Sequence, residues 1–190
     1  METEKSKDEV IREFKKKFRT PRGIAAGDVQ NSAIRYCLTE YSRSICPISK
    51  DDIIDSLEFF DWKCPYSGKE IKKDGSNRSE FELDHIVPIN RFSCGLNIKG
   101  NVVFVSKEVN RAKAQKNWED FLRNDITLGS GREEREKRIK EIKRFQAKTG
   151  YDKYLASDFV IKMSNRLREI YTAIGERIAS DFSYLKNIKP

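Results

Sequence analysis

The middle of the chain contains two short runs of β-branched and aromatic residues. The first, Phe81 to Val87, is followed by Pro88, which predicts a strand that ends at the proline. Two glycines then mark a loop, and Val102 to Val105 predict a second strand. From Lys107 onward Glu, Arg, Lys, Ala and Gln dominate, a composition with high helix propensity. The pattern therefore predicts the order strand, loop, strand, helix.

Apolar residues three or four positions apart predict helices on both sides of this segment. The helices expected before it rest on three sets of positions: Val10, Ile11, Phe14 and Phe18; Ala33, Ile34, Cys37, Leu38 and Tyr41; and Ile53, Ile54 and Leu57. Ser49, with Asp52 three residues later, indicates a capping box at the start of the third helix. After the central segment, Asn117 is placed to cap a short helix, and residues 132–144 predict an exposed helix of mixed charge.

The last predicted helix carries an apolar stripe about seven turns long. Its positions are Val160, Met163, Leu167, Ile170, Ile174, Ile178, Phe182 and Leu185. Such a stripe usually packs on its own domain, but its length also allows a two-fold interface and hence a homodimer. Residues 128–131 are the best linker signal. We expect an α+β fold in three parts: an N-terminal helical arm over residues 1–61, a core over 62–125 and a C-terminal helical region over 126–190.

The central segment also carries residues suited to cutting a phosphodiester bond. Hydrolysis needs a nucleophilic water, stabilisation of charge on the phosphate and help for the departing oxygen. His85 is the only histidine, and an imidazole with a pKa of about 6.5 can take a proton from water near neutral pH. Asp84 and Asn110 offer carboxylate and amide oxygens, the hard ligands that suit Mg²⁺ or Mn²⁺. Lys113 lies three residues beyond Asn110 on the same helical face, so we expect its ammonium to approach the phosphate or the leaving oxygen.

Two interpretations of these residues are open. Successive side chains of a regular strand point to opposite faces, so Asp84 and His85 converge only if the backbone bends or the substrate bridges them. The alternative is that Asp-His is a chance surface pair and that the asparagines are ordinary turn or cap residues. The complete ordered pattern favours a site.

This order of elements and residues resembles the HNH endonuclease family, over roughly residues 62–122. The resemblance implies a small ββα-metal core, in which one divalent cation is held between a strand and a helix. It also implies that Asp84 and Asn110 are the metal ligands and that His85 is the general base. Asn101 then matches the middle asparagine, which helps to fix the histidine loop. Residues 63–71 are similar to the hairpin that precedes the strands in this family.

The resemblance is incomplete at the cysteines. Many members of the family carry two Cys-x-x-Cys pairs that hold a structural zinc, but the matching positions here are Cys64 with Ser67 and Ser106 with Val109. Only one cysteine remains at these positions, so we expect no structural zinc. Since the chain shows no secretion signal, we expect its four cysteines to be reduced.

The charge of the chain favours an anionic partner. A formal net charge of +8 and a pI near 9.3 point to nucleic acid, and we expect DNA. Arg111 is one candidate contact, and a basic N-terminal cluster either tracks phosphates or forms a solvated helix face. The cluster consists of Lys15, Lys16, Lys17, Arg19 and Arg22. No apolar run approaches the roughly 20 residues needed to cross a bilayer, so we expect a cytoplasmic protein without a membrane partner.

Together these features predict a metal-dependent DNA endonuclease. Among the roles that the family resemblance allows, we favour a restriction or phage-defence nuclease, because the chain adds only helical, basic elements to a compact core. A homing or phage-type nicking endonuclease is the second choice. The alternative from a different functional class is a non-catalytic nucleic-acid-binding module with a vestigial HNH site. Such a module would bind nucleic acid without cutting it in Mg²⁺ and Mn²⁺.

Overall fold

The computed structural model describes residues 26–125 and 128–187. Its elements are α2 (Ala26–Ile45), α3 (Lys50–Phe59), the 3₁₀-helix η1 (Arg78–Glu80), β1 (Phe81–His85), β2 (Val102–Ser106), α4 (Lys107–Lys113), α5 (Trp118–Asn124), α6 (Arg132–Thr149), α7 (Tyr151–Leu155) and α8 (Asp158–Asn187). This mixture of helices with a small antiparallel sheet confirms the α+β expectation. The helix expected from Val10 to Phe18 lies outside the described residues. Within the described ranges, no helix is both long and apolar enough to cross a membrane.

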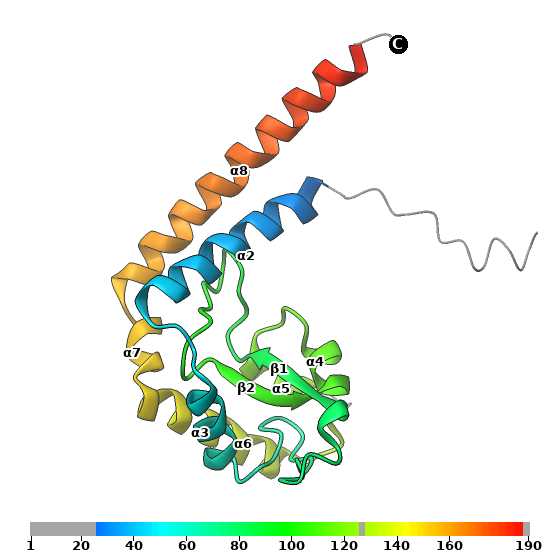
Figure 1. The fold of residues 1–190 in the computed structure, drawn as a ribbon, viewed down its shortest axis with the longest axis vertical. Helices are drawn as coiled ribbons and strands as arrows, with labels where there is room; N and C mark the ends of the chain where they lie inside the picture. The colour runs from blue at the N-terminus through cyan, green and yellow to red at the C-terminus, as the bar shows by residue number, and fades with distance from the viewer. Residues whose placement is uncertain (1–25, 126–127, 188–190) are drawn as a thin grey trace, which may run out of the picture.

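β1 and β2 pair in antiparallel register, with Phe81 opposite Ser106 and His85 opposite Val102. Every residue of β2 is buried, since both α3 and α4 pack against this strand. β1 ends at His85, two residues before its predicted end, because the Val87 N–H donates to the side chain of Asn101 instead of continuing the ladder. The predicted order strand, loop, strand, helix is confirmed (Figure 1).

Local signals determine where α3 and α4 begin. Ser49 and Asp52 form the expected capping box at the start of α3. The Ser106 hydroxyl accepts the Val109 N–H, so α4 follows β2 without an intervening loop. The position of α4 is therefore set by the end of a fully buried strand, which restricts where its side chains can lie.

α2 and α8 lie side by side and run in opposite directions (Figure 1). Near one end of the pair, the ring of Tyr41 stacks on Phe159 with 5.4 Å between centroids. Near the other end, Gln30 Nε2 donates to the Tyr171 carbonyl at 2.6 Å. One hydrophobic core joins all the predicted parts of the chain, with members that include Ile34, Leu38, Phe104, Val105, Ile142, Phe145 and Leu167.

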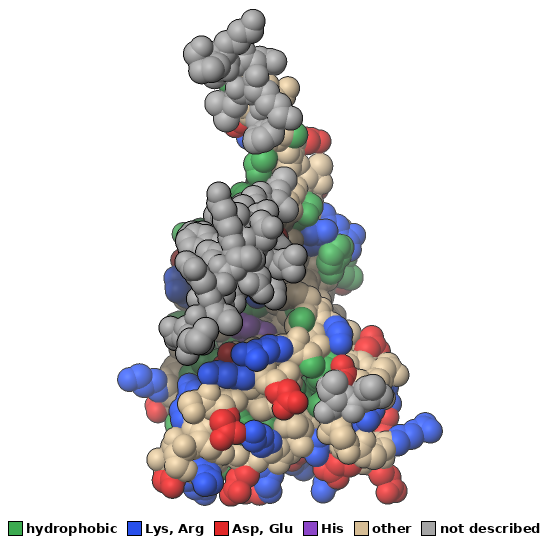
Figure 2. Space-filling model, turned by 90° about the vertical axis from the view of Figure 1, so that its right-hand side faces the viewer, with side chains coloured by type: hydrophobic (Ala, Val, Ile, Leu, Met, Phe, Trp, Pro, Cys, Tyr) green, Lys and Arg blue, Asp and Glu red, His purple; other side chains and the backbone are tan. Residues whose placement is uncertain are grey.

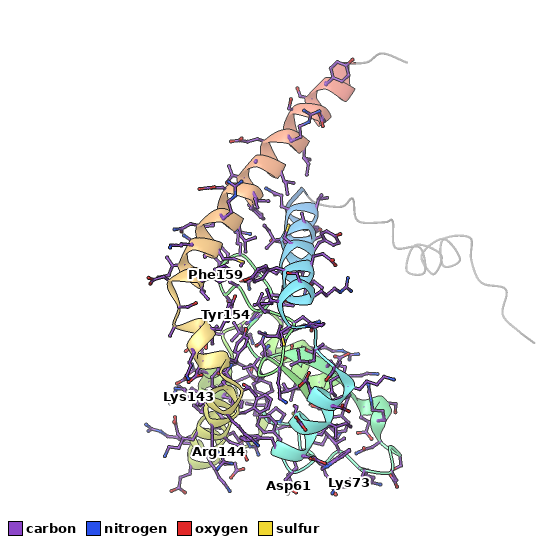
Figure 3. All side chains as sticks on the ribbon, turned by 60° about the vertical axis from the view of Figure 1, so that its left-hand side comes forward. Asp61, Lys73, Lys143, Arg144, Tyr154 and Phe159 are labelled. Atoms are coloured by element: carbon purple, nitrogen blue, oxygen red, sulfur yellow. The ribbon has the colours of Figure 1, made fainter. Side chains whose placement is uncertain are left out.

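α6 is only partly exposed, although its mixed charge predicted an exposed helix. Ile139, Ile142 and Phe145 are buried on its inner side, and the Phe145 ring lies 5.0 Å from that of Phe60. Lys143 and Arg144 remain at the surface (Figure 3). Three well-spaced apolar residues are thus enough to attach this charged helix to the core.

The first half of the α8 stripe packs on its own chain. Leu167 is 4% exposed and belongs to the core, and Val160, Met163 and Ile170 pack against it. The end of α8 extends beyond α2 (Figure 1), and Tyr184 there is 70% exposed. The side chains of Phe182 and Leu185 lie outside the described residues.

Leu167→Ala should lower the free energy of unfolding by about 2–5 kcal/mol, because it removes a buried side chain between α8 and the core. Ile161→Ala is the matched control: it lies on the same helix, is 63% exposed and should change stability by no more than about 0.5 kcal/mol. Urea unfolding followed by circular dichroism measures both. Equal effects would show that α8 does not pack on the core in this register.

Candidate active site

The predicted metal ligands lie where β1 and α4 face each other. Glu82 and Asp84 are two residues apart on β1 and share one face of the strand. Asn110 and Lys113 are three residues apart on α4 and share one face of the helix. Asn110 Nδ2 donates to Glu82 Oε1 at 2.9 Å, and Lys113 Nζ lies 2.9 Å from Asp84 Oδ2. Both expected ligands are therefore held at the contact between the strand and the helix.

Lys113 lies beneath this contact, not at the surface. Its side chain is 1% exposed, and its ammonium donates to the His85 carbonyl at 2.8 Å in addition to the ion pair with Asp84. An unpaired charge in the interior is costly, so the ammonium depends on these partners. The contacts fit a residue that positions Asp84 and the end of β1. Its expected approach to the leaving oxygen stays a prediction.

Asp84 offers a carboxylate oxygen that suits a cation. The residue is buried, and its Oδ2 lies 2.9 Å from the Lys113 ammonium, so one carboxylate oxygen is engaged in the ion pair. An ionised carboxylate has two oxygens with about four lone-pair sites, so it can keep this ion pair and still ligate a cation. The Asn110 amide supplies a second hard oxygen, so the residues present fit Mg²⁺ or Mn²⁺. The part of the chain that the structure describes has no group of three or more His, Cys, Asp or Glu side chains suited to a metal, so water and substrate oxygens would complete the coordination.

His85 is oriented by a different partner, the side chain of Asn97. His85 Nε2 lies 3.1 Å from Asn97 Oδ1. The amide oxygen only accepts, so this contact assigns the imidazole proton to Nε2 and leaves the Nδ1 lone pair free. Burial lowers the pKa of His85 below its usual 6.5, with a smaller opposing effect from the Asn97 hydrogen bond. The imidazole is therefore neutral near pH 7, the form that can accept a proton.

Asn97 is held in turn by the helical arm. Its backbone N–H donates to the Ser42 hydroxyl at 2.9 Å, and this hydroxyl donates to the Leu38 carbonyl at 2.7 Å. Ser42 is fully buried in α2. The orientation of His85 thus depends on α2 as well as on the central strands.

Asn101 closes the loop between β1 and β2. Its Oδ1 accepts the Val87 N–H at 2.7 Å, and its Nδ2 donates to the carbonyls of Val87 at 3.0 Å and Leu96 at 2.8 Å. Gly95 allows this close packing, because an added Cβ would lie 2.1 Å from the Val87 oxygen. These are the contacts that a loop-fixing asparagine needs.

Three residues of this arrangement were not identified from the sequence: Glu82, Asn97 and Ser42. The spacing of Glu82 from Asp84 was an available signal, because residues two apart on a strand share a face. No local pattern identifies the other two. They lie 55 positions apart in the chain and meet only in the fold.

Basic side chains lie near the histidine, which is visible at the surface in purple (Figure 2). Arg111 is exposed on α4, where it lines a shallow hollow of about 610 Å³ together with Lys69, Glu80, Lys107 and Glu108, at the end of β1 and β2 opposite His85. The expected DNA contacts Lys15, Lys16, Lys17, Arg19 and Arg22 lie outside the described residues.

The sequence model of the HNH endonuclease family matches residues 64–117. This match confirms the resemblance and spans β1, β2, α4 and the predicted site residues on them. No curated protein gives a significant match to the chain. HNH enzymes are nucleases that act on DNA and generally use a divalent metal ion. The family match therefore supports a nuclease-type function for the segment that contains the site.

Lys113→Met should lower the free energy of unfolding in EDTA by about 3–5 kcal/mol, because it leaves the buried Asp84 carboxylate without its ammonium. Saturating Mn²⁺ should restore part of this loss, since a bound divalent cation again neutralises the carboxylate. Chemical unfolding with and without Mn²⁺ measures the difference.

Lys107→Met is the control, because Lys107 is exposed on the same helix. It should be nearly neutral under both conditions. An unfolding free energy for Lys113→Met that does not respond to Mn²⁺ would contradict the linkage between this ammonium and the metal site.

Proposed function

We propose that this chain is a metal-dependent endonuclease that hydrolyses phosphodiester bonds in DNA. The observation that carries the proposal is the position of Asp84 and Asn110 where β1 faces α4, with a neutral, oriented His85 at the end of the same strand. The family match over residues 64–117 supports it independently.

Each side chain has a role that follows from its contacts. His85 takes a proton from the attacking water through Nδ1, the nitrogen that Asn97 leaves free. Asp84 and Asn110 would hold Mg²⁺ or Mn²⁺, and the bound ion would supply charge stabilisation at the phosphate. Lys113 keeps the Asp84 carboxylate in place, and Asn97 keeps the imidazole in the tautomer that can act as a base.

A hollow beside the base has a net positive lining, with two arginines and one aspartate, Asp28. It measures about 550 Å³ and is lined by α2, the loop after β1 and the residues after α4. Arg35 and Arg91 contribute to its lining, and Arg35 lies close enough to His85 to lower the pKa of the imidazole. Guanidinium groups at this position can neutralise the phosphates that flank a scissile bond.

His85→Ala should lower the cleavage rate by about 10²- to 10⁴-fold, the range expected for loss of a general base, while DNA affinity stays close to that of the parent. Single-turnover cleavage of plasmid in Mg²⁺ or Mn²⁺ measures the rate, and fluorescence anisotropy measures binding. Near-parental cutting would remove His85 from the mechanism.

Two variants of Asn97 test whether this side chain orients the His85 imidazole. Asn97→Leu removes the acceptor for Nε2–H and should slow cleavage, whereas Asn97→Asp keeps an acceptor oxygen and should retain more activity. Because the chain has one histidine, ¹⁵N NMR reports its tautomer without overlap. An unchanged tautomer in Asn97→Leu would contradict the positioning role.

Asp84→Ala and Asn110→Ala should each weaken Mn²⁺ binding, with the larger loss at Asp84 because it supplies the negative charge. Isothermal titration measures both, with the exposed Asp51→Ala as the control. EDTA should stop cleavage reversibly without unfolding the chain, and metal analysis should find no tightly held zinc. Parental Mn²⁺ affinity in both variants would show that the ligand assignment is wrong.

We place this activity in restriction or phage defence, in the cytoplasm, on the ground that the additions to the nuclease core are helical and the chain is basic. End sequencing of fragments from methylated and unmethylated genomic DNA tests the role. Cutting that depends on methylation supports it, whereas a single rare site cut regardless of methylation would favour a homing enzyme.

For the homodimer that the length of the C-terminal helix allows, we infer that only the part of α8 beyond α2 is available as an interface. Leu167 and its apolar neighbours already pack on the core of their own chain. Sedimentation velocity over a concentration series tests this, and a monomer at every concentration would exclude the homodimer.

A further inference from the structure

An exposed aromatic ring lies at the edge of the hollow beside His85. Phe92 is 60% exposed, in the loop between β1 and β2, and it lines this hollow together with Arg35 and Gln115. A phenyl ring that stays mostly exposed beside a hollow lined by arginines is placed to contact a partner.

The backbone around Phe92 is held in place from within the turn. Asn90 Oδ1 accepts the N–H groups of Phe92 at 2.9 Å and Ser93 at 2.8 Å. The amide of Asn90 also donates to Gln115 Oε1 at 3.2 Å, which ties the turn to the segment just after α4. This asparagine turn directs the ring outward.

Two helices of the C-terminal region hold the same turn. Ser164 of α8 donates its hydroxyl proton to the Arg91 carbonyl at 2.9 Å. Tyr154 of α7 donates to the Cys94 carbonyl at 2.9 Å, and its ring lies close to Phe159 where α7 meets α8 (Figure 3). The position of Phe92 is therefore set before any partner binds.

Positive charge surrounds the ring. The Arg91 guanidinium lies 4.3 Å from the Phe92 ring and 3.7 Å from that of Tyr171, and its Nη1 donates to Asn31 Oδ1 at 3.1 Å. The exposed Arg168 lies 5.7 Å from the Phe92 ring. An apolar ring between guanidinium groups matches a surface that offers stacked bases between phosphates.

We propose that Phe92 is a wedge that inserts between adjacent base pairs of duplex DNA, while Arg91, Arg168 and Arg35 contact the neighbouring phosphates. Proteins that insert Phe in this way partly unstack a base step and kink the duplex, which would bring the strand toward His85. The inference rests on the proposed endonuclease function, because it takes DNA as the partner of that site.

The test uses the full chain carrying His85→Ala, so that the DNA stays intact, and a set of duplexes with 2-aminopurine at successive positions. Unstacking should raise the fluorescence at one step when the wedge is present. Phe92→Ala should abolish this rise and weaken binding by about tenfold, whereas Phe92→Leu should retain most of both.

Two controls separate this inference from the proposed function. Ile54→Ala removes another exposed apolar side chain, on α3 and outside the hollow, and should leave fluorescence and affinity unchanged. Mn²⁺ affinity should be the same with and without Phe92, because the ring does not touch the metal site. None of these measurements requires cleavage. The wedge can therefore be disproved while the endonuclease function is upheld, and the endonuclease function can be disproved while the wedge is upheld. Equal DNA affinity and equal fluorescence in Phe92→Ala and Ile54→Ala would overturn the wedge, as would a rise in 2-aminopurine fluorescence with single-stranded DNA and none with duplex DNA.

Discussion

One buried ammonium joins the strand and the helix on which the site depends. Lys113 pairs with the carboxylate of Asp84 and donates to the backbone of His85, so a single side chain of α4 fixes two successive residues of β1. Successive side chains of a strand point to opposite faces, and neither residue can orient the other. The structure meets this constraint with two partners, Lys113 for Asp84 and Asn97 for His85. Since burying an ammonium is costly, the arrangement is stable only while both of its acceptors are present.

The helices before and after residues 62–125 act on the site through the loop between β1 and β2. Ser42 of α2 holds Asn97, which orients the proposed base. Tyr154 of α7 and Ser164 of α8 hold the turn that carries Phe92. The same helices pack on one hydrophobic core with the strands, so the loop is supported on both sides. We therefore regard the helical arms as the elements that preorganise this loop.

Sequence patterns predicted the parts of the fold that depend on neighbouring residues. β1, β2 and α4 follow from β-branched runs, Pro88 and helix propensity, and the α3 capping box follows from Ser49 and Asp52. Sequence patterns did not predict the burial of Lys113, because a long charged side chain on a helix is normally exposed. The link from Ser42 to Asn97 also could not be read locally, since it joins residues that only tertiary packing brings together. The burial of one side of α6 was underestimated because its three apolar positions are sparse among charges.

The central claim is that the metal ligands and the histidine form one site. The single histidine allows a direct measurement of this, because its imidazole gives one set of NMR signals. Bound Mn²⁺ is paramagnetic and broadens signals of nearby nuclei, whereas Mg²⁺ does not. The account predicts that one equivalent of Mn²⁺ broadens the His85 imidazole signals beyond detection in the parent chain and leaves them sharp in Asp84→Ala. Sharp imidazole signals in a parent chain shown by titration to have bound Mn²⁺ would contradict it.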